Sequence, residues 1–143
     1  MGEKIAGENL GNECVSASLD AYENVFPIVV RTMKMIESLD QLSVKQKHLL
    51  DELQCHCLGI VLNIADGNNS CLKTERITLY KNAASHLSRT QSLLLLLNSL
   101  GILNKNVVFD LCAEYENCLG VLNSMLTDAE DSRICDFGRQ NVC

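Results

Sequence analysis

The sequence predicts an all-α protein, an antiparallel up-down four-helix bundle, from three observations. Of its 143 residues 47% are hydrophobic, one is proline and none is tryptophan. Apolar residues recur at helical spacing, and β-branched residues do not alternate with polar ones. Short capping segments separate four such apolar runs, which favours antiparallel neighbours. We expect the bundle to cover residues 16–126, between a flexible segment over 1–15 and a flexible acidic tail over 127–143.

The first helix is expected from about Ser16 to about Leu39, where apolar residues follow helical spacing. Pro27 lies inside this run. It either kinks one long helix or occupies the first turn of a helix that begins near Asn24. We favour one kinked helix. The segment before it holds three glycines, three acids and few apolar residues, which is typical of a flexible end.

The second helix begins with a capping-box signature, Ser43 followed three residues later by Gln46. We expect it to end at Gly67 in the left-handed conformation of a C-terminal cap. Leu58 and Leu62 add a second apolar face, which suggests burial against a partner. The inner stripe is expected to be Leu50, Leu53, Cys57, Val61 and Ile64.

The third helix is expected to open at Thr74 and to end at Gly101, with Ile102 packing back on its last turn. Asn104 then caps the fourth helix. The inner face of the third helix is expected to hold Ile77, Tyr80, Ala84, Leu87, Leu94 and Leu97. That of the fourth is expected to hold Val108, Leu111, Tyr115, Cys118, Leu122 and Met125.

Five consecutive leucines occupy positions 93–97 of the third helix. Each residue advances a helix by about 100°, so five in a row cover every direction around its axis. A helix that covers one side of a small bundle needs only an apolar stripe. We therefore expect this helix to be buried twice, in its own subunit and against another copy. The candidate oligomer-interface residues are Leu58, Leu62, Leu93, Leu95 and Leu96.

Eight cysteines are present, and the N-terminus lacks the apolar core of a signal peptide. Reduced thiols in a cytoplasmic protein are therefore expected. Cys55 and Cys57 flank His56 like a metal clip, but neighbours two apart on a helix point about 200° apart. Core packing is the favoured interpretation, so neither a metal site nor a cofactor is expected. No apolar run reaches the length of about 20 residues that spans a bilayer.

Charge is unevenly distributed along the chain. The net charge is −6, yet positions 25–109 hold nine bases and six acids, and the acidity lies at the two ends. Because a local basic face is what meets phosphate, this middle segment could contact a polyanion. Solvated helix faces are the alternative interpretation. The candidate nucleic-acid contacts are Arg31, Lys34, Lys45, Lys47, Lys73, Arg76, Lys81 and Arg89.

No catalytic constellation is visible in the sequence. His48, His56 and His86 have no acidic partner at catalytic spacing, and we interpret them as polar helix or interface residues. Neither a phosphate-binding glycine loop nor paired catalytic carboxylates are found. We therefore do not expect an enzyme.

Two blocks of the sequence resemble a known family. Residues 63–67, Asn-Ile-Ala-Asp-Gly, are close to the family's Asn-Ile-Ala-Glu-Gly, and residues 94–96 and 100–103 are close to its triple leucine and Leu-Gly-Tyr-Leu ending. The spacing between the blocks also fits, and the resemblance covers about residues 22–126. The chain thus resembles the four-helix-bundle proteins that include rRNA intervening-sequence proteins and the accessory variability protein of diversity-generating retroelements.

That resemblance implies a ring-shaped homo-oligomer, with a pentamer favoured. It also implies a non-catalytic accessory protein that binds a reverse transcriptase and its RNA or DNA template. Two departures stand against this. Asn68, Asn69 and Ser70 occupy the place where the family often carries arginine, and the chain is acidic overall. The alternative is a structural or protein-binding oligomeric bundle with no role in nucleic-acid binding.

Overall fold

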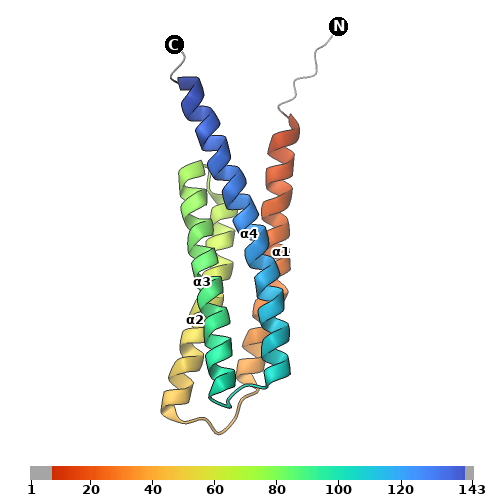
Figure 1. Ribbon diagram of the computed structural model, residues 1–143. Helices are drawn as coiled ribbons and strands as arrows, with labels where there is room; N and C mark the ends of the chain where they lie inside the picture. The colour runs from red at the N-terminus through yellow and green to blue at the C-terminus, as the bar shows by residue number, and fades with distance from the viewer. Residues whose placement is uncertain (1–7, 141–143) are drawn as a thin grey trace.

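The computed structural model describes residues 8–140, with side chains over residues 20–131, and in that range the chain forms four helices and no strand. They are α1 (Glu8–Glu37), α2 (Val44–Asn69), α3 (Lys73–Ser99) and α4 (Lys105–Gln140). Each helix runs antiparallel to the next and packs against two neighbours (Figure 1). The predicted all-α four-helix fold is confirmed. Over the described range, no helix is both long and apolar enough to cross a membrane.

α1 is one continuous helix that contains Pro27, so the prediction of one helix through Pro27 is confirmed and a helix that begins near Asn24 is excluded. Proline lacks the N–H that would bond to the carbonyl of Glu23 one turn earlier, so the helix continues without that bond. α1 begins at Glu8, whereas the sequence placed a flexible segment over 1–15. Residues 1–7 lie outside the described part of the chain.

The N-terminus of α2 is fixed by the predicted capping box. The Gln46 backbone N–H donates to the Ser43 hydroxyl at 3.2 Å, and the Ser43 N–H donates to Oε1 of Gln46 at 3.0 Å. Two of the backbone donors that a helix leaves unpaired at its start are satisfied in this way. This cap fixes the residue at which α2 begins after the connection from α1.

The predicted left-handed cap at Gly67 is wrong. α2 continues to Asn69 and its C-cap is Ser70, so Gly67 is an interior helical residue. Its lack of a side chain serves close packing instead. A Cβ at this position would lie 2.6 Å from Cε1 of Tyr80 on α3, and the Tyr80 hydroxyl donates to Oδ1 of Asn68 at 2.7 Å. The glycine therefore provides space for an aromatic ring.

The end of α3 matches the prediction. Gly101 has φ 74°, and the Ile102 N–H donates to the Leu97 carbonyl at 3.0 Å while the Gly101 N–H donates to the Asn98 carbonyl at 2.9 Å. This pair of bonds is a Schellman motif, in which glycine avoids the steric cost of a Cβ at positive φ. Asn104 then caps α4 by accepting from the Asn106 N–H at 2.9 Å.

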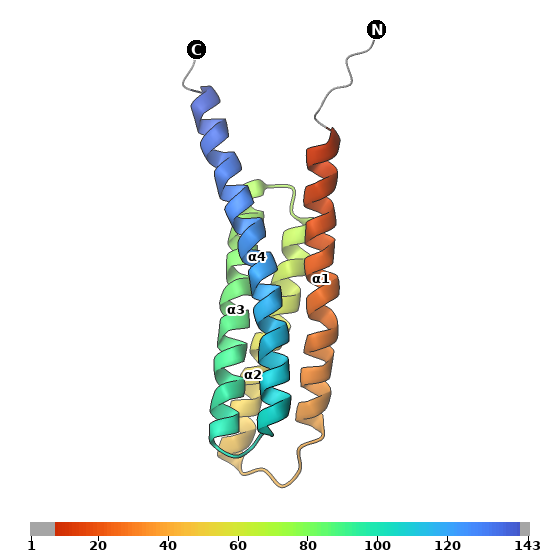
Figure 2. The same ribbon diagram turned by 45° about the vertical axis from the view of Figure 1, so that its right-hand side comes forward.

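The start of α3 and the end of α4 lie outside the ranges expected from the sequence. α3 begins at Lys73 after Leu72, which makes no side-chain cap. α4 continues to Gln140, where the sequence placed a flexible tail from 127. Leu126 is buried, Ala129 packs against the core, and Glu130 pairs with Lys81 on α3. These contacts extend the bundle beyond its predicted end, and α1 and α4 both extend past the α2–α3 connection (Figure 2).

The centre of the bundle contains one buried polar layer. Each helix contributes one of its residues, namely Thr32, Cys57, Thr90 and Tyr115. The hydroxyls of Thr32 and Tyr115 lie 2.8 Å apart, and Sγ of Cys57 lies 3.7 Å from the Tyr115 hydroxyl. Thr90 donates to the His86 carbonyl at 2.9 Å. Among the described side chains no buried polar atom lacks a partner, so this layer avoids the cost of an unpaired buried polar group.

Burial in this layer changes the acidity of its groups. It raises the pKa of the Cys57 thiol above its ordinary value, and it strongly raises the pKa of the Tyr115 phenol. Both effects have desolvation as their largest cause, because a buried thiolate or phenolate would lose its hydration. Cys57 is therefore a neutral thiol at physiological pH.

Candidate interaction surfaces

The five leucines of α3 divide between the core and the surface. Leu94 and Leu97 are fully buried and Leu93 is half-buried, whereas Leu95 and Leu96 are each 44% exposed. The bundle of one chain therefore covers only part of the run. The two other predicted interface residues, Leu58 and Leu62 on α2, are 50% and 51% exposed.

Leu95 lies on the side of α3 that faces α4. Gln91, one turn earlier, donates through Nε2 to the Cys112 carbonyl of α4 at 3.2 Å, and residues four apart share a helix face. Phe109, which precedes Cys112 by three residues, is 51% exposed and carries the Lys105 ammonium 5.5 Å from its ring centre. We call the exposed residues here the α3–α4 patch. It consists of Leu95 and Phe109, whereas Leu96 lies about 140° around α3 from Gln91 and points away from α4.

Leu58 and Leu62 lie on the opposite flank of the molecule. His56 faces α3, because its Nδ1 lies 3.0 Å from Nδ1 of His86. Leu58 follows His56 by two residues, which is about 200° around the helix. Leu62 lies one turn further along the same face. Both leucines therefore project on the α1 side of α2.

Phe26 lies on the α2 side of α1. Arg31 pairs with Glu114 of α4, and a step of five residues turns a helix by about 140° away from that direction. Phe26 is 44% exposed and stacks on Tyr22, with ring centres 5.6 Å apart. This aromatic pair borders the seam between α1 and α2.

Phe26 and Leu62 also lie at a similar height along the bundle. Thr32 and Cys57 mark a common level, because both contact the Tyr115 hydroxyl. At 1.5 Å per residue, Phe26 is about 9 Å above that level and Leu62 about 7.5 Å above it. We call this set of exposed residues the α1–α2 patch. It consists of Phe26, Leu58 and Leu62.

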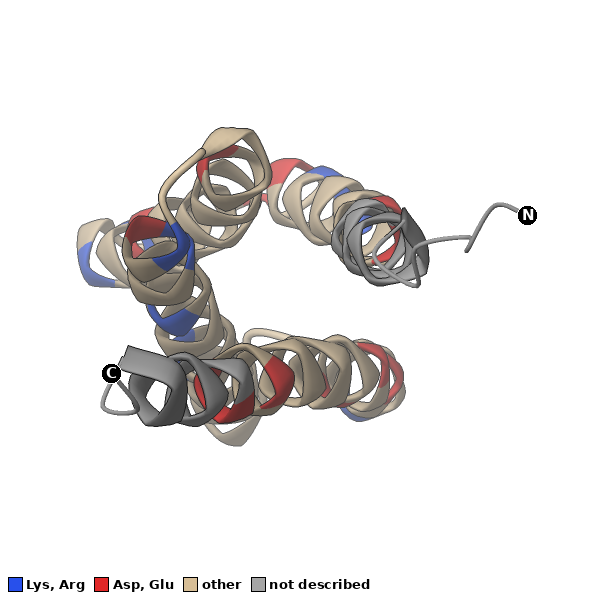
Figure 3. Cartoon of the chain, turned by 90° about the horizontal axis from the view of Figure 1, so that it is seen from above, with Lys and Arg blue, Asp and Glu red and all other residues tan. Residues whose placement is uncertain are grey.

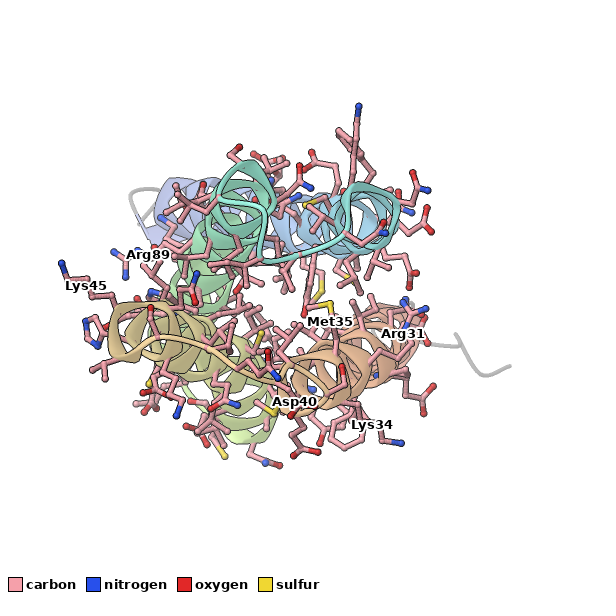
Figure 4. The ribbon with its side chains drawn as sticks, turned by 90° about the horizontal axis from the view of Figure 1, so that it is seen from below. Arg31, Lys34, Met35, Asp40, Lys45 and Arg89 are labelled. Atoms are coloured by element: carbon pink, nitrogen blue, oxygen red, sulfur yellow. The ribbon has the colours of Figure 1, made fainter. Side chains whose placement is uncertain are left out.

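The two patches occupy different sides of the bundle. Seen along the axis, α1 and α2 lie on one side and α3 and α4 on the other (Figure 4). The α1–α2 patch and the α3–α4 patch thus point away from each other. A monomer with two separate apolar patches of this kind has two surfaces to cover, not one.

The eight basic candidates do not form one surface. Arg31 forms an ion pair with Glu114, and Lys81 forms one with Glu130 at 2.7 Å. Arg31 and Lys34 lie on α1, far across the bundle from Lys45 and Arg89 (Figure 4). Lys47 is exposed, whereas Lys73 and Arg76 are half-buried in the first turn of α3. Figure 3 shows Lys and Arg on more than one helix with Asp and Glu among them.

A shallow groove runs between α2 and α3 beside Arg89. Its lining residues are Glu52, His56, Ser88, Arg89, Ser92 and Leu93. The His56–His86 pair lies at this groove, with ring centres 5.2 Å apart. Burial lowers the pKa of His86, and the nearby His56 and Arg89 lower it further, so this imidazole is neutral at pH 7. Glu52 Oε2 lies 3.9 Å from Nε2 of His56.

The histidine pair was missed by reasoning from the sequence. His56 and His86 are 30 residues apart, and nothing in the pattern of either helix marks the other as its neighbour. The expected core packing holds for Cys57, which is buried, but is wrong for Cys55, which is exposed. His48 is exposed.

Comparisons of the chain with protein-family models, with curated proteins and with solved structures find no match.

Proposed function

We propose that this chain is a non-catalytic, self-assembling helical subunit whose copies bury the α1–α2 and α3–α4 patches against one another. The observation that carries the proposal is the exposure of Leu95 in a run whose members Leu94 and Leu97 are fully buried. Covering apolar area stabilises association by about 25 cal/mol per Å². Copies that meet at these patches remove five large apolar side chains from water.

The position of the patches favours head-to-tail contacts over a two-fold dimer. A two-fold interface joins the same patch on both subunits, whereas a head-to-tail interface joins two different patches and closes into a ring when the rotation allows. Patches on opposite sides suit the second arrangement. The ring, and the pentamer that the family resemblance favours, belong to this proposal.

The accessory role with a reverse transcriptase and its RNA or DNA template is the finer part of the proposal. Its support is the resemblance in residues 63–67 and 94–103, together with Lys45 and Arg89, which lie on the same side of the bundle (Figure 4). Repetition around a ring multiplies these two basic residues. Contacts of this kind weaken steeply as salt is raised.

The alternative is an oligomeric bundle that binds only proteins. The ion pairs of Arg31 and Lys81 favour it, because they neutralise two of the eight basic candidates within the chain. The net charge of −6 favours it as well. Under this alternative the copies still bury the two patches against one another, but the assembly binds no nucleic acid.

Light scattering after gel filtration tests the assembly. We expect the full chain to have a mass several times the 15.8 kDa of one copy. Leu95→Glu and the double variant Leu58→Glu, Leu62→Glu should each give monomers, because a charge in either patch prevents its burial. Val44→Glu is the matched control, since Val44 is 85% exposed at the start of α2 and lies outside both patches.

Mixing the two variants separates a ring from a dimer. Each variant retains one intact patch, and the two variants retain different patches. With a head-to-tail contact, one copy of each variant therefore forms a heterodimer, and nothing larger forms. A two-fold interface gives no such pairing. A full chain that remains monomeric at micromolar concentration would overturn the assembly proposal.

Fluorescence anisotropy with a labelled structured RNA, at two salt concentrations, tests the accessory role. We expect binding at low salt that falls at high salt, and a weaker signal for the double variant Lys45→Ala, Arg89→Ala than for Arg31→Ala. No binding at low salt by the assembled protein contradicts the accessory role and leaves the alternative.

A further inference from the structure

His56 of α2 and His86 of α3 face each other across a seam that opens to solvent. Their Nδ1 atoms lie 3.0 Å apart, and His56 lines the groove that runs along the surface there. A hydrogen bond between neutral imidazoles accounts for this distance if one Nδ1 carries a proton. The same distance also suits a second arrangement, in which both Nδ1 atoms hold one metal ion.

The geometry points to a two-histidine site for a divalent transition-metal ion of the zinc class, bound through Nδ1 of His56 and Nδ1 of His86. Zinc–nitrogen bonds are about 2.0–2.1 Å long, which separates two bound nitrogens by about 2.9 Å at a right angle and about 3.3 Å at the tetrahedral angle. The observed 3.0 Å falls between these values. The separation of the two nitrogens therefore suits one shared ion.

Glu52 is placed to support His56 as a ligand. Its carboxylate lies 3.9 Å from Nε2 of His56, the nitrogen that points away from His86. Histidine ligands commonly donate their remaining N–H to a carboxylate, which fixes the tautomer and strengthens the ligand. A proton on Nε2 leaves the Nδ1 lone pair of His56 free for the metal. The half-exposed Glu52 side chain can close the remaining distance by rotation.

Gly59 explains why His86 can lie against α2. A Cβ at this position would lie 2.8 Å from three atoms of the His86 ring, so any other residue would displace the ring. Asn63 donates to the Gly59 carbonyl at 2.7 Å on the same stretch of helix. The absence of a side chain at Gly59 therefore provides the space that the His86 ring occupies against α2.

The pair supplies only two of the ligands that such an ion takes. Among residues 20–131 no third histidine, cysteine or carboxylate joins the pair as a ligand, and the Cys57 thiol contacts the Tyr115 hydroxyl in the core. Water would fill the remaining positions. Two imidazoles select ions such as Zn²⁺, Cu²⁺ or Ni²⁺ over Mg²⁺, which prefers oxygen ligands.

Imidazole NMR of the full chain, treated with a chelator and then titrated with Zn²⁺, tests the site. We expect the ring nitrogen signals of His56 and His86 to shift together while those of His48 stay unchanged, and Mg²⁺ to shift none of them. His48 is the matched control, because it lies on the same helix and is exposed. Residue-specific signals also separate this site from ions bound by the exposed thiols of Cys55 and Cys71.

Two variants complete the test. His86→Gln should weaken Zn²⁺ binding at His56 at least tenfold, whereas His48→Gln should leave it unchanged. Gly59→Ala should weaken it as well, because the added methyl group displaces the His86 ring. If Zn²⁺ shifts neither signal, the pair is a hydrogen bond only and the proposal is overturned. The outcome does not depend on whether the chain assembles or binds RNA.

Discussion

Two seams of the bundle are held together in different ways. α2 and α3 approach through glycines, because the Tyr80 ring lies on Gly67 and the His86 ring lies on Gly59. α1 and α4 are bridged by side chains instead. Thr32 bonds to the Tyr115 hydroxyl in the core, an ion pair joins the two helices at the surface, and the helices diverge toward their free ends (Figure 1).

The difference teaches where each seam tolerates change. At Gly59 and Gly67 of the α2–α3 seam an added methyl group must displace an aromatic ring. A seam bridged by polar side chains tolerates changes of shape but depends on each partner of its hydrogen bonds. We therefore expect substitutions that add volume to destabilise the α2–α3 seam. Substitutions that remove a polar group should destabilise the α1–α4 seam.

Gly67→Ala should have the largest effect. The added Cβ would lie 2.6 Å from the Tyr80 ring, and overpacking of this kind costs about 1–3 kcal/mol. Chemical denaturation at a fixed protein concentration measures the loss. Gly120→Ala is the matched control, because a Cβ there meets nothing within 4 Å. Alanine in an open helical position should stabilise the protein by about 0.5–1 kcal/mol. Equal effects at the two positions would contradict the packing role of Gly67.

Tyr115→Phe should have the next largest effect. It removes the hydroxyl that contacts Thr32 and Cys57 but leaves the ring volume unchanged. Thr32 keeps its bond to the Ile28 carbonyl at 2.8 Å, so we expect a loss of about 1 kcal/mol in the free energy of unfolding. Tyr22→Phe, on the half-exposed ring that stacks on Phe26, should cost less. If the two substitutions cost the same, the layer does not hold the α1–α4 seam.

Alkaline pH should weaken the same layer by a smaller amount. Burial raises the pKa of Cys57 above its ordinary value of 9.0, so near pH 9 the unfolded chain loses this proton while the folded chain keeps it. Stability from this group is therefore complete below pH 9 and declines as pH rises, by about a few tenths of a kcal/mol at pH 9. Unfolding measured at pH 7.5 and pH 9 should show this decline, and Cys57→Ala should reduce it.

The sequence contained enough to predict the fold but not the seams. Helical spacing, the Ser43–Gln46 cap and Gly101 are local signals, and each depends on residues within a few positions of one another. Gly67 was assigned to the wrong role because a glycine near a helix end has two uses, and only the position of Tyr80 decides between them.

The same limit applies to the candidate sites. The leucine run signalled an uncovered surface, because its composition alone exceeds what one bundle can bury. The basic residues gave no such signal, since which of them share a surface depends on how the helices pack. Arg31 could not be matched with Glu114, nor His56 with His86, before α4 and α3 had been placed.

Arg31→Gln should have the smallest effect, and it sharpens the contrast within the α1–α4 seam. Its partner Glu114 and the guanidinium itself are both substantially exposed, and exposed ion pairs contribute about 0–1 kcal/mol because water and salt screen them. We expect a loss of a few tenths of a kcal/mol that disappears at high salt, measured beside Tyr115→Phe. A loss larger than that of Tyr115→Phe would mean that the surface pair, and not the buried layer, holds α1 to α4.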